Sequence, residues 1–378
     1  MIQPADEITI SRSDDKALRA AVDDVMEVRD TTYAPAPGVV VRFRGRLRIA
    51  SDQAYRVVAE RFRARGYMAF FHRDQDTDAD AILAAVGQPN TSSRLWLALL
   101  LFAVTFLSVL YVGALNEVGD FVPALFEIAR GLPFALSLLA ILLAHEMGHF
   151  VAGKLLGMPM SFPFFIPLPL PPLGTMGAVI QMKAPPVNRR AMLVVGAAGP
   201  IAGLVVALPV LLLGFSMSQI TPLDLSQPIL MEGNSILYLA LKFLWFGKVL
   251  PGGGEDVMIH AVAFAGWTGL FITALNLLPV GQLDGGHIVN ALFGDRVALL
   301  RWPIIVALVV LGLWPGGWMG WLLWAGLIFI FGGIRAQPLD DLTRLRPWHR
   351  ALGLAMIALL ILIFVPAPLT IWGEWPPV

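Results

Sequence analysis

One short segment of the chain carries side chains that together could bind a metal ion and hydrolyse a peptide bond. Residues 144–150 read AHEMGHF, which matches the pattern H-E-x-x-H. On a helix, His145 and His149 stand four residues apart and share one face, so both imidazoles can reach a single tetrahedral ion. Glu146 adjoins the first histidine and could take a proton from water that zinc makes acidic, with a pKa of about 7. The segment therefore predicts a hydrolytic zinc site.

The surroundings of the motif favour function over coincidence. A five-residue match with two free positions also arises by chance, and the two histidines could form a structural hydrogen-bonded cluster. Here, however, the motif lies inside an apolar run, where ionisable side chains are costly unless they face a protein interior. The chain has no cysteine, so any metal ligands must be histidines and carboxylates.

A catalytic zinc site needs a third protein ligand besides the two histidines. The apolar span that ends NLLPVGQLDGGH, residues 276–287, places Asp284 near the depth and side of the histidines, so Asp284 is the predicted ligand. His287 could reach the metal or merely cap the segment, whereas Asp295 is more simply read as an exposed loop residue. Asn276 could bind the substrate backbone or a developing oxyanion, or make an interhelical hydrogen bond.

The composition shows what kind of protein must position these residues. Of 378 residues, 57% are hydrophobic and only 14% are charged, which is typical of a membrane protein. The formal net charge is zero, so nothing indicates a nucleic-acid partner. The charged residues concentrate in the first 94 positions, and the chain therefore divides into two regions.

Apolar runs near the ~20 residues that a bilayer-spanning helix needs follow from residue 94 onward. We expect a polytopic α-helical membrane protein of about seven transmembrane helices, at 94–115, 131–156, 192–215, 258–283, 297–314, 317–333 and 351–365. The apolar stretch 234–250 is expected to lie along the membrane interface.

The loop charges predict an orientation. The acidic residues Glu117, Asp120, Asp224 and Glu232 fall on one side, and basic residues gather on the other with the N-terminal region, which predicts a cytoplasmic N-terminus. The basic residues of this second side are Lys154, Lys183, Arg189, Arg190, Arg296, Arg301, Arg335, Arg344, Arg346 and Arg350.

The first residues lack a basic segment followed by an apolar one, so no cleaved signal peptide is predicted. We expect a multi-pass protein of a bacterial or archaeal cell membrane.

Residues 1–90 are predicted to form a small cytoplasmic α+β soluble domain. A helix is expected over 16–30, followed by a breaker run at 33–38; a strand over 39–49, a helix over 52–65 and a strand over 67–72 follow. The strand at 39–49 carries a row of arginines that is either a solvated face or a contact for anionic headgroups. These arginines are Arg42, Arg44, Arg46 and Arg48.

The transmembrane domain is expected over 94–368, with a core at 131–290, and a tail is expected at 369–378.

The connection at 158–190 is dense in proline and yet strongly apolar. The prolines forbid a regular helix, and apolar non-helical backbone at membrane depth is tolerated only against protein or around a water-filled cavity. We therefore expect a membrane-associated β-hairpin or re-entrant loop with a strand in 174–182.

The combination of HEMGH at 145–149 with NLLPVGQLDGG at 276–286 resembles the site-2 protease family of intramembrane zinc metalloproteases, peptidase family M50. The likeness covers about 131–290. GTMGAVI at 174–180 is similar to the family's hairpin, and GAAGPIAG at 196–203 to its small-residue packing helix. The sequence lacks a PDZ-like insertion and most resembles members, including chloroplast homologues, that have an N-terminal soluble domain.

The resemblance implies an activity and a set of site residues. It implies Zn²⁺ and the cleavage of transmembrane segments of other membrane proteins, with the bilayer as the surrounding medium. It also implies substrate contacts of Asn276 and, in the hairpin, of Gly174 and Gly177. The implied metal ligands and catalytic base are His145, His149, Asp284 and Glu146.

Two other classes of protein compete with this interpretation. A transporter could bind a passing cation at the same ligands, but it has no need for a carboxylate such as Glu146 beside the first histidine, and no internal repeats are evident. An inactive structural membrane protein that keeps the ligands is the second alternative.

Overall fold

The computed structural model describes residues 12–74, 77–87, 94–223, 226, 229–334 and 336–372. These residues fall into two compact units. Unit 1 comprises Met1–Ser92, Met182–Met192 and Ala336–Pro347, and unit 2 comprises Ser93–Gln181, Leu193–Arg335 and Trp348–Val378. The predictions that concern Asp224, Arg335 and residues 373–378 of the tail lie outside the described residues, as does the side chain of Asp295.

Unit 1 is built on a four-stranded antiparallel sheet in the order β1-β2-β4-β3. The strands are β1 (Met26–Ala36), β2 (Val39–Leu47), β3 (Tyr67–Arg73) and β4 (Asp80–Val86), and helices α1 (Arg12–Val22) and α2 (Ser51–Arg63) contribute to the same core. In β2, Val41 and Phe43 are fully buried, whereas Arg42 and Arg44 point to the other face of the sheet, as the alternation of a strand requires.

The predicted helix over 16–30 and the breaker run after it are wrong in part. Helix α1 ends at Val22, and Met26–Ala36 form strand β1, which pairs with β2. Pairing with a neighbouring strand overrides weak helical character. Pro35 fits because β1 lies at the edge of the sheet, where a residue without an N–H loses no ladder bond.

Two segments from far along the chain extend the β3 edge of this sheet. Phe71 N–H donates to Leu339 O at 2.7 Å, and Asp341 N–H donates to Phe71 O at 2.9 Å. Leu339 N–H in turn donates to Pro186 O at 2.8 Å. Unit 1 thus contains the predicted domain of residues 1–90 together with the two segments 182–192 and 336–347, and the independence of that domain stays a prediction.

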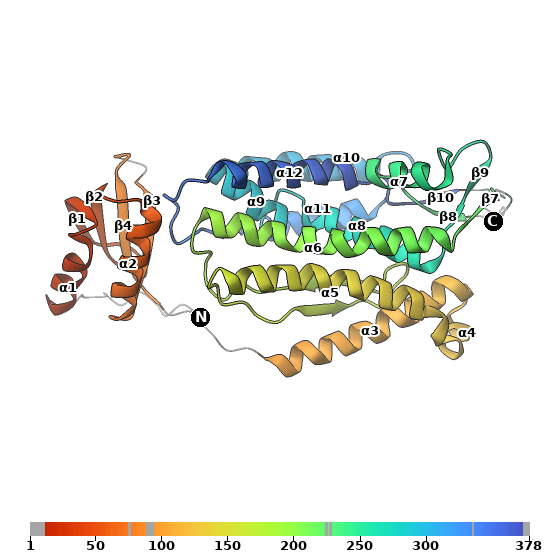
Figure 1. The fold of residues 1–378 in the computed structure, drawn as a ribbon, viewed down its shortest axis with the longest axis horizontal. Helices are drawn as coiled ribbons and strands as arrows, with labels where there is room; N and C mark the ends of the chain where they lie inside the picture. The colour runs from red at the N-terminus through yellow and green to blue at the C-terminus, as the bar shows by residue number, and fades with distance from the viewer. Residues whose placement is uncertain are drawn as a thin grey trace. The chain divides into compact units, whose positions relative to one another are not determined.

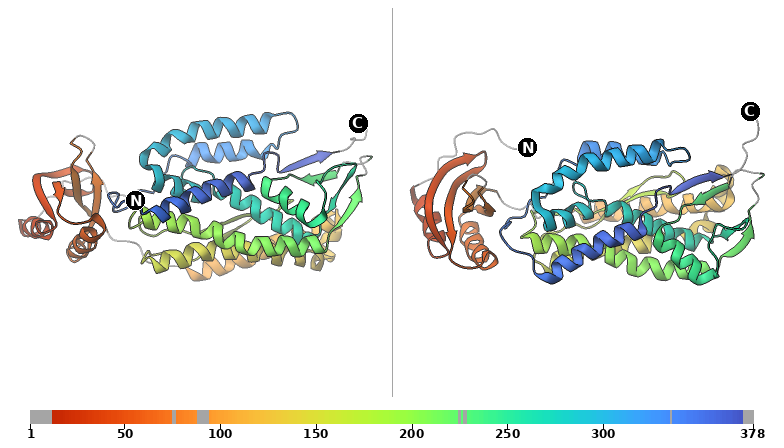
Figure 2. Two further views of the ribbon diagram at one scale, coloured as in Figure 1. Left: turned by 45° about the horizontal axis from the view of Figure 1, so that its top comes forward. Right: turned by 90° about the horizontal axis from the view of Figure 1, so that it is seen from above.

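Unit 2 contains four helical segments long and apolar enough to cross a membrane within the described residues. They are α3 (Leu95–Val118), the run Ile128–Leu155 of η1 (Ile128–Gly131) and α5 (Leu132–Leu155), α6 (Arg189–Ser216), which begins in unit 1, and the run Arg296–Leu313 of η2 (Gly294–Leu300) and α10 (Arg301–Leu313). Figures 1 and 2 show most helices of unit 2 running side by side. By helix length and apolar composition, the predicted seven spans are therefore not confirmed. Shorter apolar helices are α7 (Ile236–Phe246), α8 (Ala261–Asn276), α11 (Gly320–Phe331) and α12 (Pro347–Ile363).

The predicted span over 258–283 is shorter than expected. Helix α8 ends at Asn276, and after an irregular turn the chain starts a new helix, α9 (Asp284–Phe293). The break follows from Pro279 and from Gly281, whose φ of 58° favours glycine.

The expected hairpin in the proline-rich connection is present. Strands β5 (Phe164–Pro167) and β6 (Thr175–Val179) pair antiparallel, and Gly174 precedes β6 with a φ of 76°. A Cβ at Gly174 would lie 2.8 Å from the Cα of Val109 in α3, so the hairpin packs tightly against that helix.

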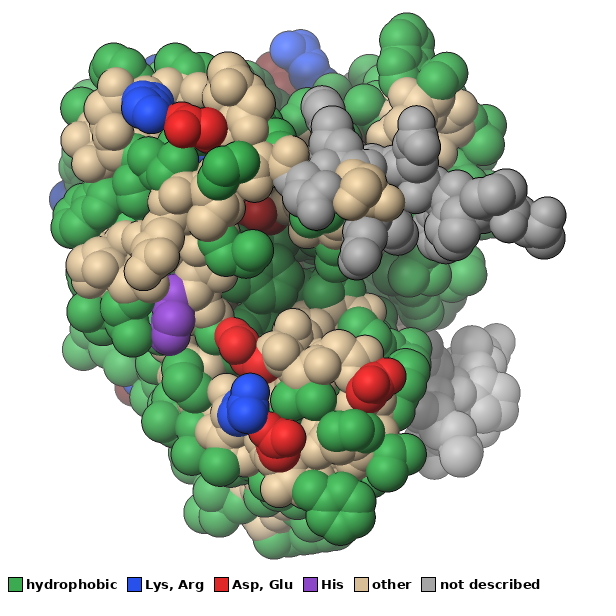
Figure 3. Space-filling model, turned by 90° about the vertical axis from the view of Figure 1, so that its right-hand side faces the viewer, with side chains coloured by type: hydrophobic (Ala, Val, Ile, Leu, Met, Phe, Trp, Pro, Cys, Tyr) green, Lys and Arg blue, Asp and Glu red, His purple; other side chains and the backbone are tan. Residues whose placement is uncertain are grey.

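The end of unit 2 that Figure 3 faces carries two small sheets. Strand β7 (Gln219–Pro222) pairs with β9 (Glu255–Met258), and β8 (Ile229–Glu232) pairs with β10 (Leu369–Trp372) in the predicted tail. Figure 3 shows a surface dominated by hydrophobic side chains, with few charged groups and a central hollow. Within the expected interfacial stretch 234–250, Lys242 is fully buried.

Candidate metal centre

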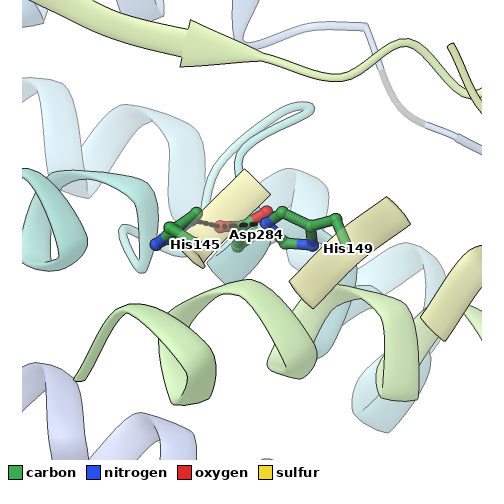
Figure 4. Close-up of side chains that lie close together, drawn as sticks. All are labelled: His145, His149 and Asp284. Atoms are coloured by element: carbon green, nitrogen blue, oxygen red, sulfur yellow. Dashed lines mark hydrogen bonds and ion pairs between the residues drawn. The ribbon is translucent and has the colours of Figure 1, made fainter. Parts of the chain in front are cut away.

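The structure brings His145, His149 and Asp284 together in one cluster. The two histidines lie on one face of α5, and Asp284 is the first residue of α9 (Figure 4). Asp284 Oδ2 lies 3.1 Å from His145 Nε2 and 3.2 Å from His149 Nε2. Among the described residues, these three form the one group of histidine and acidic side chains whose ligand atoms converge within 4.8 Å.

The local fold explains how a carboxylate far along the chain reaches the histidines. After α8, a close turn returns the backbone so that α9 begins against the end of α8, and a Cβ at Gly285 would lie 1.9 Å from Leu277 O. Only glycine permits this approach. Asp284 thereby occupies the first turn of a helix, where the dipole stabilises a negative charge.

A backbone carbonyl fixes the orientation of the second histidine. His149 Nδ1 lies 2.8 Å from Val195 O in α6. Because a carbonyl oxygen only accepts, Nδ1 must carry a proton, and the other ring nitrogen, Nε2, is the one that faces the cluster. Such an outer hydrogen bond orients metal-binding histidines in many proteins.

The donor set fits a tetrahedral metal ion. Nε2 of His149 and the carboxylate of Asp284 can lie this close with either a proton or a metal cation between them, and a zinc ion can bind both. Ligand atoms at ~2.0–2.2 Å from a tetrahedral zinc stand roughly 3.3–3.6 Å apart, close to the two separations of 3.1 and 3.2 Å. The group is shielded from solvent, since His145 and His149 are 3% and 7% exposed.

Comparison with known proteins places this arrangement in a family. Residues 133–311 match the family model for peptidase family M50. The chain belongs to peptidase family M50. The matched M50 region includes α5, with His145 and His149, and the whole of α9, with Asp284. No solved structure matches the chain.

Curated relatives of this M50 chain include proteins named probable zinc metalloprotease EGY1, chloroplastic. The one from Oryza sativa subsp. japonica is 30% identical over 76% of this chain and 52% of its own length. The one from Arabidopsis thaliana is 31% identical over 76% and 55%. Probable zinc metalloprotease EGY2, chloroplastic, from Oryza sativa subsp. indica is 26% identical over 89% and 63%. The M50 chain spans roughly half to two thirds of the length of these relatives.

These relatives contradict the predicted localisation in a bacterial or archaeal cell membrane with a cytoplasmic N-terminus. They are named as chloroplastic proteins of plants. The prediction failed because loop charges indicate which loops share a side of a bilayer, but they do not identify the membrane.

The remaining predicted site residues of the M50 chain lie at different distances from the cluster. Glu146 is 5% exposed and adjoins His145 in α5. Asn276 Nδ2 lies 3.4 Å from His145 Nε2, so this amide lies beside the cluster. His287 is buried one turn after Asp284 but does not join the converging ligand atoms.

The two predicted glycines lie in the hairpin and not in the metal cluster. Gly174 O accepts a hydrogen bond from Ser108 Oγ at 2.7 Å, and Gly177 N–H donates to Thr175 Oγ1 at 3.0 Å. A Cβ at Gly177 would approach Ile272 of α8 at 3.9 Å. The hairpin of the M50 chain is therefore held between α3 and α8.

Helix α6 supplies residues that sequence reasoning did not assign to the site. A Cβ at Gly199 would lie 2.0 Å from His149 Nε2, and one at Gly203 would lie 3.0 Å from His145 Nδ1. Their signal in the sequence is the small-residue run 196–203, which indicates close helix packing without identifying the partner. Val195 contributes a backbone carbonyl, which leaves no signal in the side-chain pattern.

Proposed function

We propose that this chain is an intramembrane zinc endopeptidase that cleaves transmembrane segments of other membrane proteins. The observation that carries the proposal is the convergence of His145 Nε2, His149 Nε2 and Asp284 Oδ2 from two helices, with Glu146 beside them. Membership of peptidase family M50 and the names of the relatives support it.

The proposed roles follow from the chemistry of each side chain. His145, His149 and Asp284 would hold the metal. A bound zinc ion supplies Lewis acidity and makes a water molecule acidic enough to lose a proton near neutral pH. Glu146 takes up the proton of the attacking water at its carboxylate and passes it to the leaving amine. Asn276 holds the substrate carbonyl through its amide N–H groups.

The substrate class follows from the position of the site. The two histidines lie in α5, part of a helical run long and apolar enough to cross a membrane, and the shorter apolar helices α8, α11 and α12 would complete seven spans. A peptide bond in a helix is hidden by its own hydrogen bonds, so the substrate must unwind before attack. The β5–β6 sheet has only two strands and can accept an unwound segment by strand addition next to Gly174 and Gly177.

Glu146→Gln tests the proposal because glutamine keeps the shape of the side chain and cannot take up a proton. Purified variants are assayed on a panel of single-span membrane proteins, and their zinc content is measured by elemental analysis. Glu146→Gln should keep about one zinc per chain and lose cleavage by roughly 10²-fold or more.

The matched control is Glu127→Gln, an acid 43% exposed in its side chain, which should cleave like the unaltered chain. Cleavage by Glu146→Gln close to that of the unaltered chain would remove Glu146 from the mechanism. Full zinc occupancy after His145→Ala and His149→Ala together would overturn the metal site itself.

A further inference from the structure

An apolar cavity of about 170 Å³ lies beside the helix that begins with Asp284. Helix α9 contributes one wall, α12 contributes the opposite wall, and the turn after α8 closes the inner end. The lining residues are Leu277, Pro279, Gly285, Ile288, Val289, Phe293, Leu300, Met356, Ile357 and Leu360.

The cavity runs along two antiparallel helices and opens at one end. Gly353 in the first half of α12 lies next to Leu292 near the end of α9. Leu360 near the end of α12 and Gly285 at the start of α9 both line the cavity, so the two helices run antiparallel. The inner end is thus next to Asp284. The outer end is at Phe293 and Leu300, which are 54% and 37% exposed.

The lining determines the kind of occupant. All ten lining residues are apolar or glycine. An apolar cavity of about 150 Å³ stays dry and accepts a benzene-sized hydrocarbon, so water is a poor occupant here. Exposed Leu354 and Ile361 on α12, and Val306 on α10, show that the surface around the cavity is apolar as well. In a bilayer, acyl chains surround such a surface.

Two arginines are close in sequence to the residues at the open end. Arg296 lies between the lining residues Phe293 and Leu300, and Arg350 lies one turn before Gly353 on α12. Both are exposed, and neither guanidinium forms an ion pair with a described residue. Guanidinium groups bind phosphate oxygens in a bidentate manner, so the open end complements a phosphate headgroup.

Exposed tryptophans indicate that this end lies at the level of the headgroups. Trp302 at the start of α10 is 57% exposed, and Trp348 at the start of α12 is 53% exposed. Tryptophan concentrates at the boundary between headgroups and hydrocarbon. Ile357 lies two turns beyond Arg350, roughly 10 Å deeper along α12, where an acyl chain would follow its headgroup.

We propose that this cavity is the binding site of one anionic phospholipid. The phosphate pairs with Arg296 and Arg350, and part of one acyl chain fills the cavity between α9 and α12. The inference does not depend on the proposed proteolysis.

Native mass spectrometry of the full chain in detergent tests the proposal. The protein is titrated with phosphatidylglycerol or with phosphatidylcholine of the same acyl chains, and the fraction that retains one lipid is measured. The unaltered chain should retain phosphatidylglycerol preferentially. Arg296→Ala and Arg350→Ala should each weaken its retention roughly fivefold, the effect of one lost cationic side chain at a membrane surface. Glycerophosphate, which has no acyl chain, should not displace the lipid.

Variants of the cavity test the acyl-chain part separately. Ile357→Trp fills the cavity below its open end and should reduce retention of both lipids, whereas Leu354→Trp, on the exposed face of the same helix, should not. Arg94→Ala removes an exposed arginine before α3 and is the charge control. Equal retention of the two lipids, or an equal loss with Arg94→Ala, would overturn the proposal. Thermal unfolding in detergent identifies any variant that is misfolded, and the arginine variants then decide.

Discussion

At the scale of single residues, the candidate site depends on the absence of a side chain at one glycine as much as on the metal ligands. Gly199 has no side chain, and the space that a Cβ would occupy is filled by the imidazole of His149. The same helix provides Val195 O, which fixes the proton on Nδ1 of that ring. A single helix therefore both orients His149 and leaves room for it.

Gly199→Ala should strongly weaken metal binding while α6 itself remains helical. The new Cβ would lie 2.0 Å from Nε2, so the ring must leave the position in which it faces Asp284. We expect zinc affinity to fall at least as far as for loss of an outer hydrogen bond, roughly 10- to 100-fold, as measured by competition with a chelator. Gly326→Ala in α11 is the matched control, because nothing lies within 4 Å of that position. Unchanged zinc affinity in Gly199→Ala would contradict the geometry.

Asp284→Ala should weaken zinc binding and abolish cleavage, because the cluster loses its single carboxylate ligand. Elemental analysis and the cleavage assay measure the two effects. Asp295→Ala, eleven residues later, should do neither. If Asp284→Ala retains zinc as the unaltered chain does, His287 becomes the ligand to test.

At the scale of elements, α7 has an unusual distribution of side chains. Its lysine points inward: Lys242 Nζ lies 3.4 Å from Asp256 Oδ1 and 3.6 Å from Glu232 Oε1. Its exposed positions carry Ile236 and Leu244. A helix with its charge inside and its apolar residues outside suits an apolar surrounding medium, whereas its position at the membrane interface stays a prediction. The ion pairs tie β8, α7 and β9 together.

Lys242→Met should destabilise the strand-bearing end of unit 2. Removal of the lysine leaves two buried carboxylates without their cation, which costs about 3–5 kcal/mol in typical buried pairs. Lys248→Met is the control, because its pair with Glu255 is 55% and 38% exposed and should contribute less than ~1 kcal/mol. Thermal unfolding in one detergent measures both variants, and equal shifts in the midpoint would show that the buried cluster is not stabilising.

At the scale of the whole molecule, unit 1 is assembled from three stretches of chain. Arg189 pairs with Asp341 at 2.6 Å, and Arg190 pairs with Asp52 at 2.9 Å. Both arginines lie at the start of α6, the helix that continues to Gly199. The first residues of α6 therefore belong to unit 1, where they help to join its three stretches.

Deletion of residues 1–92 should expose the two connecting segments of unit 1 to proteases. The segment 336–347 would lose its backbone hydrogen bonds to Phe71, and Arg190 would lose Asp52. We expect trypsin to cleave after Arg190, Arg344 or Arg346 about tenfold faster, since proteolysis follows local opening. Cleavage after Arg130 in unit 2 is the internal control and should be unchanged. Equal rates throughout would show that the segments fold without the sheet.

The sequence alone determined the local parts of the site. HEMGH within an apolar run predicts a helix with both histidines on one face, because helical spacing is a local property, and α5 is that helix. The proline-rich connection likewise predicts the hairpin, whose strands β5 and β6 are present. The alternation of apolar residues and arginines over 39–49 predicts strand β2, in which Val41 and Phe43 are buried.

Only the tertiary structure decided which distant segments contact these local elements. Asp284 lies 139 residues after His145, and their 3.1 Å separation depends on the turn that brings α9 back against the end of α8 and on the packing of these helices against α5. The steric role of Gly199 depends on which helix packs against α5, and strand β1 depends on pairing with β2. Each of these is a contact between segments distant in sequence, and no periodicity or propensity within one segment encodes the partner that it will meet.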